Sequence, residues 1–337
     1  MSVPRRYRVA LVGCGDIAET GHLPALLAHP RFELAALCDS RAERAQLLSV
    51  RSGGVPVFTD YRELLERTDL DAAVLALHPE ISVDVAIAFL RQGKAVLDEK
   101  PLARSMEDGR RLAREIESLK GVYQLGFVFR YSEQILTLAK LAQRIGAPHV
   151  CRVCVSDERL DRANTAHFAR IQQCLKNASA ITHEGSHILD FYSLWNPAPP
   201  RCVHAWAAAT QADFNGPNLW HAQYSAADGS ALNVEIVWFL PELPSTRVEL
   251  TGPRGWLHLD PRSGQGELHS AGCAPEKIFT PPLVQNWRGQ LDAFAGAIDC
   301  GESRAATVYH GLRALAATKA AELSWKEGRT VDVEQIA

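Results

Sequence analysis

The sequence lacks a long apolar run, an excess of basic residues and a dense set of cysteines. No stretch of its 337 residues approaches the roughly 20 consecutive apolar residues of a membrane-spanning helix. The basic start MSVPRRYRVALVG contains an apolar segment too short for a secretory signal. The formal net charge is -3, so neither nucleic acid nor a membrane surface is indicated as a partner. We therefore expect a cytoplasmic protein.

The eight cysteines are scattered along the chain, whereas disulfide scaffolds are short and rich in cysteine. Cys151 and Cys154 form a CxxC pattern, but the surrounding segment HVCRVCV alternates like a β-strand. Residues three apart in a strand point to opposite faces, which disfavours a shared metal or an easy disulfide. We expect both cysteines to be packing residues.

The length exceeds what one hydrophobic core usually serves, so two domains are the natural expectation. Apolar residues make up 47% and charged residues 22% of the chain, which is ordinary for a globular protein with a sizeable core. The sequence shows neither an internal repeat nor a low-complexity segment.

A glycine-rich turn follows the first predicted strand. Residues 8–12 form a short apolar run, and residues 13–18 read GCGDIA, a GxGxxA pattern. In a dinucleotide-binding turn the first glycine makes the tight turn, the second lets backbone approach a pyrophosphate, and the small third residue permits close packing of helix and strand. The following helix N-terminus offers N–H groups and a positive dipole to phosphate. The contacts expected here come from Gly13, Gly15, Asp16 and Ile17.

An acidic residue ends the second predicted strand. The apolar run 32–38 leads into Asp39, 24 residues after Gly15, where a carboxylate can bind an adenosine ribose. The alternative is that Asp39 only caps the next helix. A carboxylate would repel a 2′-phosphate and favours NAD, whereas Arg41 could hold that phosphate and keeps NADP possible.

Strands and helices then alternate through the first third of the chain. We predict strands at 55–58, 71–77, 94–97 and 122–125, and helices at 41–50, 60–67 and 81–92, with a further helix beginning after Ser105. Such alternation is typical of a doubly wound parallel sheet, which binds ligands at the carboxyl ends of its strands. Asp39, His78 and Lys100 all fall at such ends.

The motifs GCGDIA, DEKPL at 98–102 and GFVFRYS at 126–132 resemble those of the glucose–fructose oxidoreductase/inositol dehydrogenase family. The resemblance implies an NAD(P)-binding Rossmann domain, here 1–125. It also implies a substrate-binding and oligomerisation domain, here 126–337, with a large open, mostly antiparallel sheet. The expected activity is that of an NAD(P)-dependent oxidoreductase acting on a sugar, polyol or sugar acid, in a homodimer or homotetramer formed through the sheet.

The second part of the chain fits this picture by pattern. Strands are predicted at 149–157, 202–211, 219–226, 231–240, 245–251 and 255–259, and helices at 286–299 and 306–325. This part does not alternate as the first does.

The resemblance also indicates site residues. Members of the family carry a segment of the form Asp-x-Gly-x-His-x-x-Asp, and residues 183–190 read HEGSHILD in the same frame. His187 falls on the family's catalytic histidine and is expected to be the acid/base. His183 departs from the usual Asp and is placed in substrate binding, together with Asp190 and Tyr131. Lys100 of the EKP motif is expected to be the electrostatic partner. Besides the glycine-rich turn, the cofactor contacts are expected from Asp39, Arg41, Leu77, His78, Pro79, Glu99 and Lys100.

The letters HEGSH also fit the HExxH pattern of zinc peptidases. That motif requires a helix, and Gly185 disfavours a helix interior. The longer HExxHxxGxxH form fails at Asp190 and Ser193. We expect no metal site, and a zinc hydrolase is kept only as a remote alternative. A nearer alternative is a cofactor-binding regulator of the same fold without catalysis.

Overall fold

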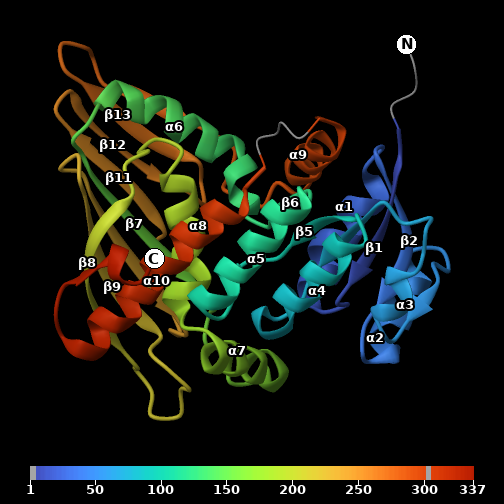
Figure 1. Ribbon diagram of the computed structural model, residues 1–337. Coiled ribbons are helices and arrows are strands. Elements are labelled where there is room, and N and C mark those ends of the chain that lie inside the picture. Colours follow the sequence, from blue (N-terminus) through green and yellow to red (C-terminus); the bar gives the residue numbers. More distant parts are fainter. Residues whose placement is uncertain (1–4, 301–304) are drawn as a thin grey trace. The chain divides into compact units, whose positions relative to one another are not determined.

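The chain divides into two compact units (Figure 1). The computed structural model describes residues 5–300 and 305–337, so residues 1–4 and 301–304 of the expected domains lie outside the described part. The first unit contains Met1–Val128 and Asn286–Leu312, and the second contains Phe129–Gln285 and Arg313–Ala337.

The first unit is built on a six-stranded sheet in which all neighbouring strands are parallel. Its strand order is β3-β2-β1-β4-β5-β6, the order of a Rossmann sheet. The strands are β1 (Tyr7–Val12), β2 (Phe32–Cys38), β3 (Val57–Phe58), β4 (Ala72–Leu75), β5 (Ala95–Asp98) and β6 (Tyr123–Leu125). The predicted doubly wound sheet is therefore confirmed.

Helices connect these strands as the alternation predicts. They are the π-helical turn Ala18–His22 with α1 (Leu23–Ala28), α2 (Ala42–Arg51), α3 (Arg62–Leu65), α4 (Pro79–Arg91) and α5 (Met106–Leu119). The Ser105 side chain accepts a hydrogen bond from the backbone N–H of Asp108 and caps α5, as its position predicts. The strand expected at 55–58 and the helix expected at 60–67 are shorter than predicted.

Helix α9 (Trp287–Cys300) belongs to the first unit, which corrects the expectation that residues 126–337 form one domain. Leu291, Phe294 and Ala295 enter the core beneath β1 and β2. The Phe294 ring stacks on Phe32 with 5.8 Å between centroids. The apolar face of α9 therefore completes the core of the Rossmann unit, although it is distant in sequence.

The second unit is built on a nine-stranded sheet of order β14-β13-β12-β11-β7-β10-β9-β8-β15. Every neighbouring pair is antiparallel except β7 and β10, so the expected mostly antiparallel sheet is confirmed. The strands are β7 (Val150–Asp157), β8 (Pro200–Ala208), β9 (Leu219–Ala226), β10 (Ala231–Trp238), β11 (Arg247–Gly252), β12 (Gly255–Asp260), β13 (Gln265–Ser270), β14 (Glu276–Phe279) and β15 (Val331–Asp332).

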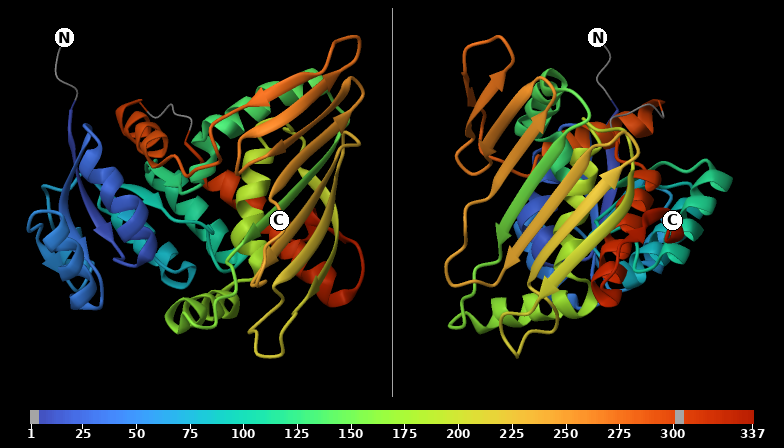
Figure 2. Two further views of the ribbon diagram at one scale, coloured as in Figure 1. Left: turned by 180° about the vertical axis from the view of Figure 1, so that it is seen from behind. Right: turned by 90° about the vertical axis from the view of Figure 1, so that its left-hand side faces the viewer.

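Helices cover one face of this sheet and leave the other bare (Figure 2). The covering helices are α6 (Glu133–Ile145), α8 (Ala180–Tyr192) and the second-unit part of α10 (Val308–Glu327), while α7 (Thr165–Asn177) precedes α8. Side chains along β8 alternate accordingly: Val203, Ala205 and Ala207 are buried, whereas His204 and Trp206 are exposed. The sequence analysis did not predict α6, α7, β13 or β14.

Cys151 and Cys154 are buried in β7 and unbonded to one another, as expected for packing residues. Burial raises the pKa of both thiols. None of the described helices is both long and apolar enough to cross a membrane.

Candidate active site

The glycine-rich turn leaves the carboxyl end of β1. Gly13 has a φ of +90°, and a Cβ at this position would lie 2.3 Å from the Ala76 carbonyl oxygen, so a side chain is excluded there. A Cβ at Gly15 would meet no atom closer than Arg44 Nη1 at 3.7 Å, which leaves an open approach to the backbone. Asp16 and Ile17 follow and lead into the π-helical turn Ala18–His22. This geometry fits a bound pyrophosphate.

Asp39 lies directly after β2 and is fastened to the turn. Its carboxylate accepts hydrogen bonds from the backbone N–H of Cys14 at 2.8 Å and of Arg41 at 2.9 Å. The Arg41 side chain is exposed and begins α2. Asp39 thus connects the ends of β1 and β2, the position from which a carboxylate side chain can bind the adenosine ribose.

The next two strand ends carry the remaining predicted cofactor residues. Leu77 and His78 follow β4, and Pro79 is the first residue of α4. Glu99 follows β5, with its backbone N–H bonded to the Leu75 carbonyl at 2.9 Å. The Glu99 carboxylate accepts a hydrogen bond from the backbone N–H of Lys100 at 3.1 Å.

His22 contributes a contact that the sequence did not indicate. Its Nε2 lies 2.8 Å from Glu99 Oε1, and both side chains are buried. The His22 ring packs edge-on against Trp287 at 4.7 Å. The π-helical turn therefore presents His22 to Glu99, and π-helical turns of this kind occur frequently at functional sites.

Asp98, the residue before Glu99, is fully buried. Its carboxyl accepts hydrogen bonds from Ser82 of α4 and from Tyr123 of β6, the latter at 3.1 Å. Burial raises the pKa of Asp98 to about 7, against the lowering effect of these hydroxyls. Asp98 thus ties the start of α4 to the strand end that carries Glu99 and Lys100.

In the second unit, α8 carries the HEGSH segment. Ser179 caps the helix, and the hydroxyls of Ser179 and Thr182 both donate to the Glu322 carboxylate on α10. Burial opposes ionisation of Glu322, but Lys319 and the two hydroxyls keep its pKa below the ordinary value. The start of α8 is therefore fixed to α10.

The expectation that Gly185 would keep HEGSH out of a helix interior is wrong, because residues 183–187 lie within α8. A Cβ at Gly185 would come 3.0 Å from Ile181 and 3.6 Å from Thr318 of α10. The closest of these contacts is with the side chain of Ile181, one turn earlier in α8, whereas the distance to Thr318 is an ordinary van der Waals contact. Among the residues that the structure describes, no group of three or more His, Cys, Asp or Glu side chains could hold a metal ion.

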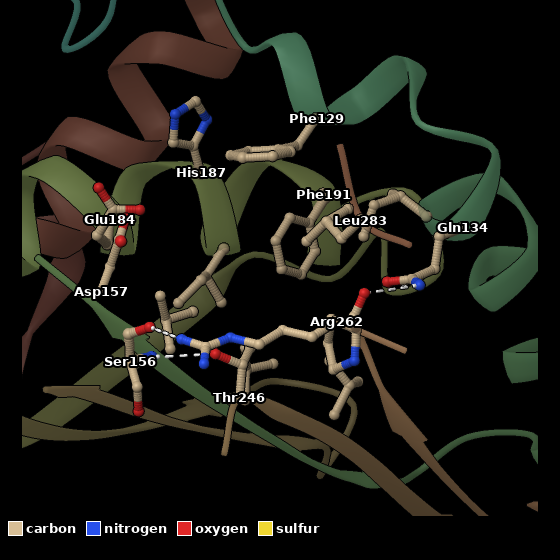
Figure 3. A pocket seen from close by; sticks show the side chains of 16 residues that line it. Phe129, Gln134, Ser156, Asp157, Glu184, His187, Phe191, Thr246, Arg262 and Leu283 are labelled. Carbon is tan, nitrogen blue, oxygen red and sulfur yellow. Dashed lines mark hydrogen bonds between the residues drawn. The ribbon is translucent and has the colours of Figure 1, made fainter. Parts of the chain in front are cut away.

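A cavity of about 190 Å³ lies between α8 and the sheet of the second unit (Figure 3). Its apolar wall comes from several elements and includes Phe129, Ile135, Val153, Ile188, Phe191 and Val248. Its polar lining includes Asp157, Glu184, His187, Thr246 and Arg262. A few polar groups in a largely apolar cavity are typical of a small-molecule site.

His187 lines this cavity from the middle of α8. The residue is 5% exposed, and its ring packs edge-on against Phe129 at 4.9 Å. Glu184 lies three residues earlier and therefore on the same helix face, and it lines the same cavity. The site thus contains a histidine and a carboxylate that can exchange protons with, or accept hydrogen bonds from, a hydroxylated ligand.

The three residues predicted for substrate binding are not part of the cavity lining. Asp190 is buried and forms a bidentate pair with Arg130, at 2.6 and 3.1 Å. Burial raises the pKa of Asp190, against the lowering effect of Arg130. The His183 ring packs near Trp238 at 5.8 Å, and Tyr131 is buried. None of the three lines the cavity, so the geometry favours a supporting role for Asp190.

Sequence reasoning missed Asp157, Glu184, Thr246 and Arg262. Glu184 could have been found from its three-residue spacing to His187 on one helix. The other three are separated by long stretches of chain and come together only through strand pairing, which no local pattern reports.

Comparison with known proteins agrees with this architecture. Residues 7–127 match the model of the Gfo/Idh/MocA family, described as an oxidoreductase family with an NAD-binding Rossmann fold. The matched segment contains all six strands of the first sheet and every predicted cofactor residue.

Similar proteins align over the whole chain or over part of it. Inositol 2-dehydrogenase 2 from Saccharopolyspora erythraea is 25% identical over 97% of this chain and 95% of its own. A dTDP-3,4-didehydro-2,6-dideoxy-alpha-D-glucose 3-reductase from Actinomadura kijaniata is 42% identical over 31% of each chain.

A solved structure of an oxidoreductase from Agrobacterium radiobacter, in complex with NAD⁺, L-tartaric acid and magnesium, shares the fold. Its TM-score is 0.86 at 18% identity, covering 98% of this chain and all of that chain. The six-stranded parallel sheet, the glycine-rich turn and the match over residues 7–127 agree, so this part of the chain matches the NAD-binding Rossmann unit of the Gfo/Idh/MocA oxidoreductase family.

Proposed function

We propose that this protein is a dehydrogenase or reductase that interconverts a carbinol and a carbonyl carbon of a sugar, polyol or sugar acid. The observation that carries the proposal is His187, buried in the wall of a small-molecule cavity, in a chain whose other unit matches an NAD-binding fold. A histidine with an ordinary pKa near neutrality can both take and return a proton.

The first unit would hold the cofactor. The turn at Gly13 and Gly15 would face the pyrophosphate, and Asp39 would bind the adenosine ribose. Leu77, His78 and Pro79 would flank the cofactor, and Glu99 would contact it from the end of β5. Asp39 favours NAD, and the exposed Arg41 keeps NADP possible. When bound, the nicotinamide accepts or supplies the hydride.

The second unit would supply the proton chemistry. In oxidation, His187 takes the proton of the substrate hydroxyl, and in reduction it returns a proton to the carbonyl oxygen. The Lys100 ammonium is assigned to the same oxygen, where a cation stabilises negative charge that develops as the proton leaves. Glu184 and Asp157 offer acceptors to further hydroxyl groups, which suits a polyhydroxylated substrate.

Thermal unfolding with and without cofactor tests the proposal. A ligand that binds the native state raises the unfolding midpoint, so NAD⁺ or NADH is expected to raise it. A larger rise with NADP⁺ or NADPH would transfer the ribose-phosphate role to Arg41. No rise with any of the four would contradict the proposal and would make zinc analysis of the protein the next experiment.

A second candidate is a cofactor-binding regulator without catalysis. The replacement of the family's Asp by His183 is the observation that favours it. A midpoint raised by cofactor, combined with no turnover across sugars, polyols and sugar acids, would support the regulator over the enzyme.

A further inference from the structure

We infer that Arg262 selects a substrate that carries a carboxylate, so that the substrate class narrows to sugar acids. This inference rests on the proposed function. Arg262 follows β12 and lines the cavity that also contains His187. In Figure 3 its side chain runs along the wall that faces His187.

The Arg262 guanidinium is held by a backbone carbonyl and, in the part of the chain that the structure describes, not by an ion pair. Its Nη2 donates to the Ser156 carbonyl oxygen at 2.8 Å, which occupies one of five N–H donors. Among the described residues no carboxylate forms an ion pair with it. Arg162 of the same unit, in contrast, pairs with Asp213. Arg262 therefore keeps a planar edge of donors available for a ligand.

The loop that carries Arg262 is built to be rigid. The Asp260 carboxylate accepts from the backbone N–H of Arg262 at 2.9 Å and from the Ser263 hydroxyl at 2.8 Å. The Pro261 carbonyl accepts from the backbone N–H of Leu283 at 2.7 Å and from Gln134 Nε2 at 3.3 Å. A fixed guanidinium loses less freedom when it binds, and its geometry matches a carboxylate through two parallel hydrogen bonds.

The other charges of the cavity explain why the ligand would be a hydroxylated acid and not a simple anion. Asp157 and Glu184 also line the cavity, so its wall carries two carboxylates against one guanidinium. A small anion gains little from such a balance. A sugar acid instead places its carboxylate on Arg262, donates hydroxyl protons to Asp157 and Glu184, and presents its reacting hydroxyl to His187.

The test compares probes that differ by one group, using thermal unfolding of the NAD⁺-saturated protein. The probes are d-glucuronate, d-glucose and d-glucosamine, and the open-chain pair d-gluconate and d-sorbitol. We expect the acids to raise the midpoint more than their neutral partners. In R262Q this preference is expected to vanish, with a loss of apparent affinity for the acids of about tenfold or more. R262K keeps the positive charge but lacks the planar guanidinium, so its preference for the acids is expected to lie between those of wild type and R262Q.

R201Q is the matched control, because it removes one exposed arginine from β8, outside the cavity lining, and is expected to behave as wild type. Equal shifts for acids and neutral partners, no shift with either acid, a preference for glucosamine, or an acid preference that survives in R262Q would each overturn the inference. The rise in midpoint by NAD⁺ alone is measured first, so that a failure of the proposed function is recognised separately.

Discussion

At the scale of residues, Lys100 and His187 are assigned to the chemical step, and Lys100 is in addition one of the expected cofactor contacts. Lys100→Ala and His187→Asn are each expected to lower turnover roughly 10²–10⁴-fold, because one removes charge stabilisation and the other the acid/base. Steady-state kinetics on a substrate found by screening measures this. The rise of the unfolding midpoint by NAD⁺ should persist in both variants. His204→Asn, on the bare face of the sheet, is the control, and a loss of turnover as large there would contradict the assignment.

Asp98 is expected to make stability depend on pH. Its pKa of about 7 in the folded protein lies above the value of about 3.9 for an unfolded chain. Between these values the folded state holds a proton that the unfolded state has lost, so the free energy of unfolding falls as pH rises from about 4 to about 7. Urea unfolding of wild type and Asp98→Asn at several pH values measures it. The stability advantage of wild type over the variant should shrink across this interval, and a constant difference would refute the prediction.

The buried pair of Arg130 and Asp190 offers a third test at this scale. Asp190→Asn leaves the Arg130 guanidinium buried without its carboxylate, which is expected to cost about 3–5 kcal/mol of unfolding free energy. Asp213→Asn breaks the exposed pair with Arg162 and is expected to cost far less, because solvent screens both charges. Chemical denaturation of both variants gives the comparison. Similar losses would mean that the Asp190 carboxylate does not stabilise the fold, and its role in substrate binding would be reopened.

At the scale of elements, the cap of α8 is expected to matter because the helix carries His187. The Ser179 side chain accepts from Thr182 N and donates to Glu322, whereas Ser132 precedes α6 without a side-chain capping bond. Ser179→Ala is expected to cost about 1 kcal/mol or more, and Ser132→Ala less. Denaturant midpoints of the two variants test this, and equal costs would show that the capping bond contributes nothing.

The elements also show what a sequence can predict. The strands of the first unit were predicted because each is a short apolar run bounded by turn residues, and the carboxyl-end residues followed from the parallel order. The position of α9 was not predicted, because the apolar face of a helix does not specify which core it joins; in the structure Phe294 stacks on Phe32, and Gly21 leaves room for Trp287. The prediction from Gly185 against a helix at HEGSH was wrong because the cost of one glycine in helix propensity is small, and in α8 the glycine leaves room for the Ile181 side chain.

At the scale of the whole molecule, the bare face of the nine-stranded sheet bears on assembly. Trp206 is 55% exposed and Trp256 is 40% exposed, and both alternate with buried neighbours along β8 and β12, which assigns them to the face that helices leave bare. Exposed aromatic residues on an open sheet are typical of an interface. We expect two copies to pair through this face with two-fold symmetry.

Light scattering coupled to gel filtration measures the mass. Trp206→Glu combined with Trp256→Glu should shift the protein toward the monomer without changing the rise of the midpoint by NAD⁺. A monomeric wild-type protein, or an unchanged mass in the double variant, would contradict this use of the sheet.

The residues of the candidate site, like the elements of the fold, divide into those that the sequence indicates and those that it does not. Asp39 was selected for its position after a predicted strand, and His187 and Lys100 for their match to motifs of a known family, so the sequence could propose roles for all three. Arg262, Thr246 and Asp157 could not, because they meet only through the register of β7, β11 and β12. The residues proposed to determine substrate specificity are therefore the ones that are hardest to identify from the sequence.

The return of α9 to the first unit has a consequence for how the protein is made. Phe294 and Leu291 reach the core beside Phe32 only after about 160 further residues have followed β6, which takes on the order of ten seconds at about 5–20 residues per second. Until then the growing chain exposes the apolar surface on β1 and β2 that α9 will cover. The ribosome thus finishes the cofactor-binding unit nearly last, although it begins it first, and a nascent chain halted between the two events would be a client for chaperones.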